Sequence, residues 1–342
     1  MPRVLFFWAA TLVLGIGFPA IARSAEPTCK ACSSDTCSCP KLPAPAPVAK
    51  AGAPGASVRR EGSWLIEETE NFQICRPVGY KVSAEVAESF ETLRQKLCQA
   101  WSPHATDKCW SPKCHVVIHA RFEGYLKEVG PGGRQTTGSS LIDFDKDQVV
   151  MRRIDIRGDR PGWFAEAVAH ELTHVVLADR FAHVQIPHWA DEGMAIQADP
   201  AGKRHRHGKD LDAALAARRE FRLAELLMLS SYPHPSRMGT FYGQSASLVN
   251  FLTHLGDKEQ LVTFVDLATS RGYDVALREI YDIPGVGALE QQWRRHLRSP
   301  QATAETVSRD HTRESPRPAE LAAVKPSTVG IEAETVVAAL VE

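Results

Sequence analysis

The chain has 342 residues, a formal net charge of -1 and 44% hydrophobic residues, which is ordinary for a globular protein. A chain of this length can bury a full hydrophobic core, and one or two domains are expected. The near-neutral charge and the lack of a basic stripe argue against a nucleic-acid-binding protein.

The N-terminal segment, residues 1–25, is predicted to be a secretory signal peptide. Arg3 provides its positive end, and the sequence from Val4 to Ala20 is almost entirely apolar. Ala20-Ile21-Ala22 is typical of a cleavage site, and Ala25 offers a second one. An uncleaved anchor is the alternative, because the apolar run is just short of a ~20-residue membrane span. We therefore expect an exported protein, which would be periplasmic, secreted or bound to the cell surface.

Eight cysteines fit an oxidising compartment, and they form two groups. The first group lies in a Cys-rich segment, residues 26–39, and consists of Cys29, Cys32, Cys37 and Cys39. This segment is predicted to be a disulfide-tied tail; metal binding, or tethering to a surface or another chain, is the alternative. The second group is predicted to form two structural disulfides of undetermined connectivity, and consists of Cys75, Cys98, Cys109 and Cys114.

The remaining chain divides by composition into a linker, a domain and a tail. Residues 40–60 are rich in Ala and Pro and are predicted to be a semi-rigid linker that cannot build a core. Residues 61–298 are predicted to form the globular domain. Residues 299–342 lose apolar periodicity and are rich in Pro, Ser, Thr, Ala and Glu, so a disordered tail is predicted.

The first half of the domain is predicted to contain a small mixed sheet. Apolar and β-branched residues predict short strands at 64–68, 71–75, 115–119 and 147–151. A helix is predicted over 82–101, where apolar residues recur at helical spacing. Gly130-Pro131-Gly132-Gly133 predicts a turn or mobile loop.

The next segment contains His170-Glu171-Leu172-Thr173-His174, in a stretch of helical apolar spacing that begins near Asp159-Arg160-Pro161. Two histidines four residues apart lie on one helix face, about 5–6 Å apart at Cβ, so both can reach one Zn2+. Glu171 can then reach a water on the open side of the metal as general base. The alternative is a chance match, in which two solvated histidines lie on a polar helix face.

A third ligand is expected downstream, because a catalytic zinc ion keeps three protein ligands and one open position. Glu192 is the best candidate, on a second short helix that starts near Trp189. Leu177 and Arg180 occupy the positions where a metzincin has Gly and His, which excludes that class. The stretch 239–243 lacks the Asp of an aspzincin.

His170–His174 followed by Trp189-Ala190-Asp191-Glu192-Gly193-Met194-Ala195 resembles the gluzincins, specifically the bacterial peptidase MA-like metalloprotease domains. The resemblance extends over about residues 60–298. It implies that His170, His174 and Glu192 bind one zinc ion per chain and that Glu171 is the general base.

Two roles stay open in this resemblance. Ile196 replaces the Asp that follows the ligand glutamate in thermolysin-type enzymes, so the groups that orient the ligand histidines are undetermined, with Asp191 and Asp199 as candidates. Tyr242 is predicted to stabilise the charge on the tetrahedral oxygen, because a Tyr of the helical lobe does so in several gluzincins. Tyr232 competes for this role, and Tyr242 is alternatively structural.

The second half of the domain is predicted to be mostly helical. Helices are expected over 210–229, 245–255, 258–270, 275–281 and 289–297. The basic run 203–207 is predicted to be a solvated loop, with a smaller chance that it lines the cleft. The expected fold is α+β and zincin-like: a small mixed sheet and an active-site helix, followed by a mostly helical C-terminal lobe.

Two functions from different classes follow from these features. The first is an exported zinc metallopeptidase whose partner is a peptide or protein substrate. The second is a catalytically inactive zincin-fold module that binds a partner at the cell surface. A scaffold alone has no physical need for Glu171, which favours the enzyme.

Overall fold

The computed structural model describes residues 3–10, 57–106 and 108–298. The predicted Cys-rich segment, most of the predicted signal peptide and linker, and the C-terminal tail lie outside the described residues. None of the described helices combines the length and the apolar character needed to cross a membrane.

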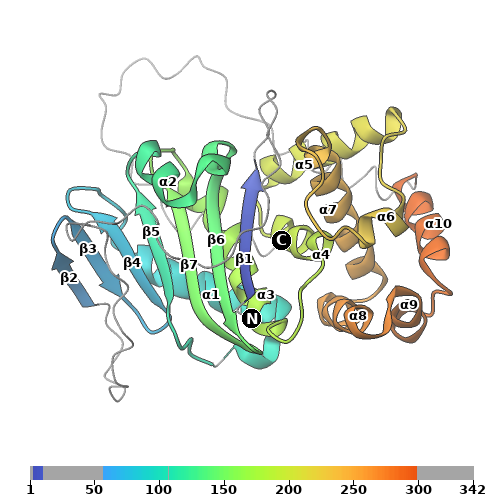
Figure 1. The fold of residues 1–342 in the computed structure, drawn as a ribbon, viewed down its shortest axis with the longest axis horizontal. Helices are drawn as coiled ribbons and strands as arrows, with labels where there is room; N and C mark the ends of the chain where they lie inside the picture. Colours follow the sequence, from blue (N-terminus) through green and yellow to red (C-terminus); the bar gives the residue numbers. More distant parts are fainter. Residues whose placement is uncertain (1–2, 11–56, 107, 299–342) are drawn as a thin grey trace, which may run out of the picture. The chain divides into compact units, whose positions relative to one another are not determined.

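A seven-stranded mixed sheet forms the first part of the domain, in the order β1-β6-β7-β5-β4-β3-β2 (Figure 1). Its strands are β1 (Arg3–Ala10), β2 (Ser57–Glu61), β3 (Trp64–Glu68), β4 (Phe72–Pro77), β5 (Cys114–His119), β6 (Thr136–Asp145) and β7 (Gln148–Arg157). The central strands β4, β5 and β7 are parallel, and the other neighbours pair antiparallel. β1 comes from the segment predicted to be a signal peptide, and it pairs with β6 at one edge.

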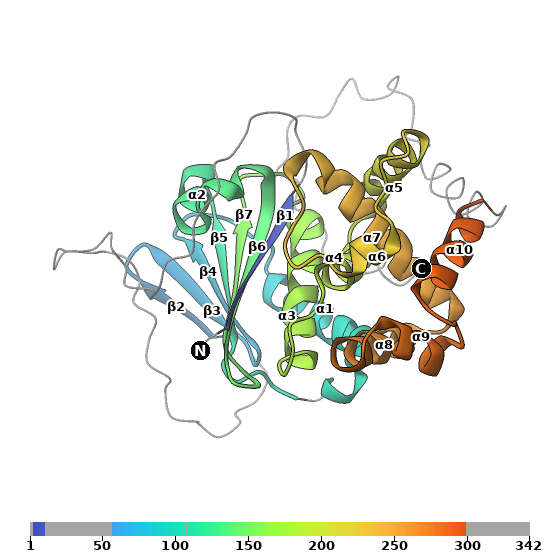
Figure 2. The ribbon, with the colours of Figure 1, turned by 45° about the vertical axis from the view of Figure 1, so that its right-hand side comes forward.

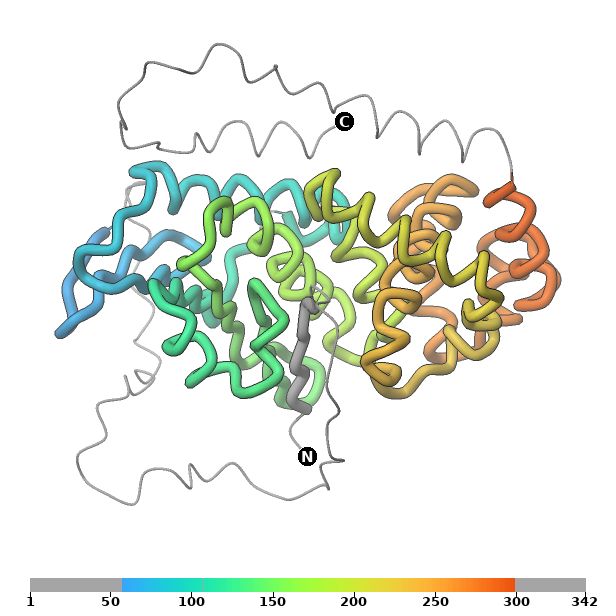
Figure 3. The backbone as a smooth tube through the Cα atoms, turned by 90° about the horizontal axis from the view of Figure 1, so that it is seen from above, coloured from blue at the N-terminus to red at the C-terminus, as the bar shows by residue number. Residues whose placement is uncertain are grey.

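The helices form two groups, one on the sheet and one beside it (Figures 2 and 3). Those in the first part are α1 (Val86–Trp101), α2 (Phe122–Val129) and α3 (Ala169–Arg180). Those in the second part are α4 (His188–Gln197), α5 (Ala201–Ala216), α6 (Leu223–Leu227), α7 (Met238–Leu255), α8 (Lys258–Arg271), α9 (Tyr273–Tyr281) and α10 (Val286–Leu297). α1 and α3 contact each other and the sheet, α1 at β4 and α3 at β6 and β7. This arrangement agrees with an α+β fold.

The core lies between the sheet and the two helices α1 and α3. Phe72 and Ile154 of the sheet, Phe90 of α1 and Leu172 of α3 are fully buried there. Burial of one such side chain contributes about 1.5–3 kcal/mol. Because the apolar positions of α3 face this core and the rest of the domain covers the other side of the helix, the polar residues between them are also buried.

The structure adds or corrects several elements. β6 and α2 were not predicted, and β2 occupies part of the predicted linker 40–60. The basic run 203–207 is not a solvated loop: it lies within α5, and Lys203 and His207 point inward. Helix propagation from residue 201 and burial of the long lysine stem against its neighbours account for this difference.

The four cysteines of the domain are free, so the two predicted disulfides are not formed. Cys75 packs with Ile66 and Val117 in a small separate cluster, whereas Cys98 and Cys114 belong to the main core. Cys109 is exposed, and its thiol lies 2.9 Å from a carboxylate oxygen of Glu70. Burial raises the pKa of Cys75 to about 11, so it stays a thiol at neutral pH.

Candidate metal centre

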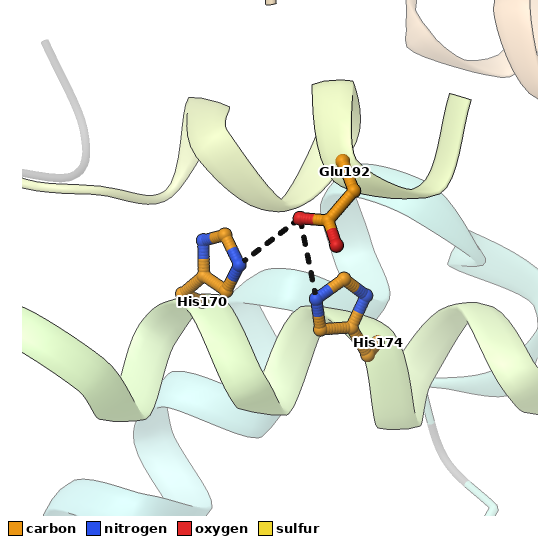
Figure 4. A group of neighbouring side chains, drawn as sticks. All are labelled: His170, His174 and Glu192. Carbon is orange, nitrogen blue, oxygen red and sulfur yellow. Dashed lines mark ion pairs between the residues drawn. The ribbon is translucent and has the colours of Figure 1, made fainter. Parts of the chain in front are cut away.

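Helices α3 and α4 bring together the three predicted metal ligands (Figure 4). His170 Nε2 lies 3.5 Å from Glu192 Oε2, and His174 Nε2 lies 4.0 Å from the same oxygen. Atoms that each bind one ion at about 2.1 Å can be at most about 4.2 Å apart, so both separations allow a shared ion. The three side chains are at most 2% exposed.

Gly193 explains how α4 reaches this position. A Cβ added at Gly193 would lie 2.6 Å from Val249 Cγ2 and 2.7 Å from the Ser245 carbonyl oxygen, both on α7. α4, the helix that carries Glu192, therefore packs against α7 more closely than any larger residue would allow.

The polar atoms at the centre fit a metal ion. Among the described residues, His170 Nε2 and Glu192 Oε2 have no hydrogen-bond partner. A buried polar atom left without a partner costs about 1–3 kcal/mol, so a ligand is expected to complete the cluster. Two imidazole nitrogens and one carboxylate oxygen form the ligand set that catalytic zinc sites use, with a fourth position left open.

Each ligand histidine has its own carboxylate partner. His174 Nδ1 lies 2.9 Å from Asp191 Oδ1, and His170 Nδ1 lies 3.2 Å from Asp199 Oδ1. Such contacts hold a ring with Nε2 toward the metal. Burial lowers the pKa of His170, but the charge of Asp199 and the contacts with Asp199 and Glu192 together outweigh this effect and raise the pKa to about 9. A metal ion binding to His170 at neutral pH would therefore displace a proton.

Glu171 is fully buried, and it lies on α3 facing β6. Its Oε2 accepts a hydrogen bond of 2.6 Å from Ser140 Oγ, while its Oε1 has no hydrogen-bond partner among the described residues. A Cβ added at Gly138 would lie 2.7 Å from Glu171 Cγ and 2.9 Å from Oε1. Burial raises the pKa of Glu171, and the charges of His170 and His174 counteract it. One oxygen is thus anchored and the other is available to take a proton.

The two tyrosines named from the sequence lie in different places. Tyr232 donates a hydrogen bond of 2.6 Å to Glu192 Oε1, and its ring packs on His188. Burial and the charge of Glu192 raise the pKa of Tyr232 well above its usual value, so it stays a donor. Tyr242 is 2% exposed, and its ring packs against His207 and Phe241. The hydroxyl that contacts a candidate metal ligand is therefore that of Tyr232, and the role of Tyr242 stays a prediction.

Sequence reasoning missed Gly138 and Ser140, because their strand was not predicted. Glycine inside a strand often marks a site where another group approaches the backbone closely, and here that group is the Glu171 side chain. This signal was available in the sequence, but only once residues 136–145 are assigned to a strand.

Comparison with known proteins gives a match to a family model over part of the chain. No curated protein and no solved structure was found to match the chain. Residues 137–299, from β6 to just beyond α10, match the sequence model described as the Peptidase MA superfamily. The match begins well after residue 60, so the resemblance stated from the sequence is supported only from β6 to the end of the domain. Over residues 137–299 the chain is similar to the Peptidase MA superfamily, and this similarity supports a zincin-like peptidase domain.

Proposed function

We propose that this protein is a zinc-dependent metallopeptidase that hydrolyses peptide bonds in peptide or protein substrates. The observation that carries the proposal is the set of buried ligand atoms of His170, His174 and Glu192 beside the unpaired Oε1 of Glu171. The similarity to the Peptidase MA superfamily supports hydrolysis as the reaction.

The residues divide the chemistry among them. A zinc ion held by His170, His174 and Glu192 would polarise the substrate carbonyl and lower the pKa of a water to about 7. Glu171 Oε1 takes the proton of the attacking water and passes it to the leaving amine. Ser140 keeps the other oxygen of Glu171 in place during both transfers. The Tyr232 hydroxyl donates a hydrogen bond to Glu192 Oε1 in this structure, and on substrate binding it would turn to the carbonyl oxygen and stabilise the negative charge that develops there.

Metal content is the measurement that tests this function. We expect purified protein to contain about one zinc ion per chain, as a set of three protein ligands with one open position predicts. Removal of the metal by a chelator should abolish peptide hydrolysis, and added Zn2+ should restore it. A folded protein that binds no zinc under these conditions would refute the proposal.

We also propose that the protein is exported. The apolar run after Arg3 and the small residues Ala20 and Ala22, which are typical of a signal peptide and its cleavage site, support export. Determination of the N-terminus of protein recovered from the cell exterior or periplasm tests it. A mature chain that starts near residue 23 or 26, and that therefore lacks the edge strand β1, is the expected result. A chain found inside the cell with Met1 intact would contradict it.

Replacing Gly138 with alanine should disturb Glu171 more than it disturbs the fold. The new Cβ would meet the buried Glu171 carboxylate at under 3.0 Å, so the side chain must move. Overpacking of this kind costs about 1–3 kcal/mol, and a displacement near 1 Å of a catalytic group can lower kcat by about 10²-fold. Hydrolysis rates and thermal unfolding measure both effects.

The matched control is Gly202→Ala on α5, where an added Cβ has no atom within 4 Å. This variant should keep its activity and should be slightly more stable, because alanine favours a helix. Equal activity of the two variants would show that Glu171 does not need the space at Gly138.

A further inference from the structure

Lys203 is a buried lysine outside the ligand set, and it lies on α5. It is 4% exposed, and a lysine is almost never buried at this level unless its charge is paired. Its Nζ lies 2.9 Å from Asp199 Oδ1 and 3.5 Å from the Glu166 carbonyl oxygen. Glu166 belongs to the π-helical turn Phe164–Val168 (η3), which leads directly into α3.

The oxygen that Lys203 contacts is the one that faces a metal ligand. Asp199 Oδ1 lies 2.9 Å from Lys203 Nζ and 3.2 Å from His170 Nδ1. Two partners on one carboxylate oxygen leave the Asp199 side chain little freedom to rotate. The contact with Lys203 therefore restrains the carboxylate oxygen that faces His170.

The charge of Lys203 also belongs to the centre. The candidate metal centre and its surroundings contain four carboxylates that are each at most 1% exposed: Glu171, Asp191, Glu192 and Asp199. Buried charges of one sign repel each other strongly at low dielectric, and the Lys203 ammonium places a cation 2.9 Å from Asp199 Oδ1 among them. Lys203 therefore offsets negative charge at the carboxylate that lies 3.2 Å from His170 Nδ1.

We propose that Lys203 is a positioning residue for the metal centre, which acts through Asp199 to hold His170 with Nε2 toward the ion. This role rests on the proposed zinc centre. A purely structural lysine would join α5 to η3 without affecting metal affinity beyond its effect on folding. The two roles differ in one respect: in a positioning role, the effect of Lys203 on metal affinity depends on the presence of Asp199.

A double-mutant cycle tests this requirement. The variants are Lys203→Met, Asp199→Asn and the double variant, and Lys209→Met is the control because Lys209 is an exposed lysine of the same helix. Zinc affinity is measured by competition with a chromophoric chelator, and the ligand field by the visible spectrum of the Co2+-substituted protein. Thermal unfolding of the metal-free forms shows whether each variant folds.

We expect Lys203→Met and Asp199→Asn each to weaken zinc binding by about 10–100-fold, the usual effect of removing a partner of a metal ligand. The double variant should bind zinc no more weakly than Asp199→Asn alone, because the two residues act in series. The Co2+ spectrum should change in these variants and stay as in the wild type in Lys209→Met.

Wild-type affinity and spectrum in folded Lys203→Met would overturn the proposal, as would losses that multiply in the double variant. If Lys203→Met does not fold, Lys203→Gln, which keeps a donor but removes the charge, takes its place in the cycle. A wild-type protein without zinc affinity would refute the proposed function instead, so the two failures are distinguishable.

Discussion

Glu171→Gln is expected to lower kcat for peptide hydrolysis by about 10²–10⁴-fold, the usual contribution of a general base. Glutamine has nearly the same shape, and its amide can still meet Ser140, so the fold should not change. It has no basic oxygen for the proton of the attacking water, however. Because Glu171 is not among the metal ligands, the variant should keep about one zinc ion per chain.

Parallel assays of hydrolysis and metal content on the same preparation check this result. Glu166→Gln is the matched control: it makes the same chemical change five residues earlier, at a partly exposed side chain. It should keep wild-type activity. Full activity in Glu171→Gln would rule out Glu171 as the base, and loss of zinc would show that the carboxylate contributes to metal binding.

The candidate ligand cluster could be predicted from the sequence because residues a few positions apart on a helix have nearly fixed relative positions. His170 and His174 must share a face if residues 169–180 are helical, and the apolar residues around them predicted that helix. Glu192 needed one further assumption, that a second helix crosses the first; Gly193 marks the close packing of that second helix on α7.

Contacts between distant segments could not be predicted in this way. Ser140 and Glu171 are 31 residues apart, and nothing in the spacing of β6 indicates which helix it will face. Lys203 lies in a run of basic residues, which usually indicates a solvated surface. Its burial depends on contacts with the Asp199 carboxylate and with the Glu166 carbonyl oxygen in the turn before α3. These contacts could be identified only from the structure.

The tyrosines show a different limit. The sequence ranked Tyr242 first by resemblance, because family likeness specifies a residue type in the helical lobe and leaves its exact position undetermined. Tyr232 lies in the irregular stretch between α6 and α7, where the path of the backbone has no periodic signature. The contact of its hydroxyl with Glu192 therefore had to come from the structure.

Tyr232→Phe is expected to lower kcat by about 10²–10³-fold, the usual effect of removing one hydrogen-bond donor to the oxygen that gains charge. KM should change little, since the hydrogen bond strengthens as the charge develops. Burial and the charge of Glu192 keep the pKa of Tyr232 well above its usual value, so the donor is present throughout the working pH range. Steady-state kinetics at saturating zinc measure both constants.

The same experiment on Tyr242→Phe decides between the two tyrosines. The Tyr242 ring packs against His207 and Phe241, so its variant should keep most of its activity. A large loss of kcat in Tyr242→Phe, with little change in Tyr232→Phe, would restore the assignment made from the sequence. If Tyr232 serves only to hold the Glu192 carboxylate, then Tyr232→Phe should weaken zinc binding and regain its rate when zinc is added in excess. A low kcat that persists at full zinc occupancy would therefore identify the Tyr232 hydroxyl as a group that acts on the substrate.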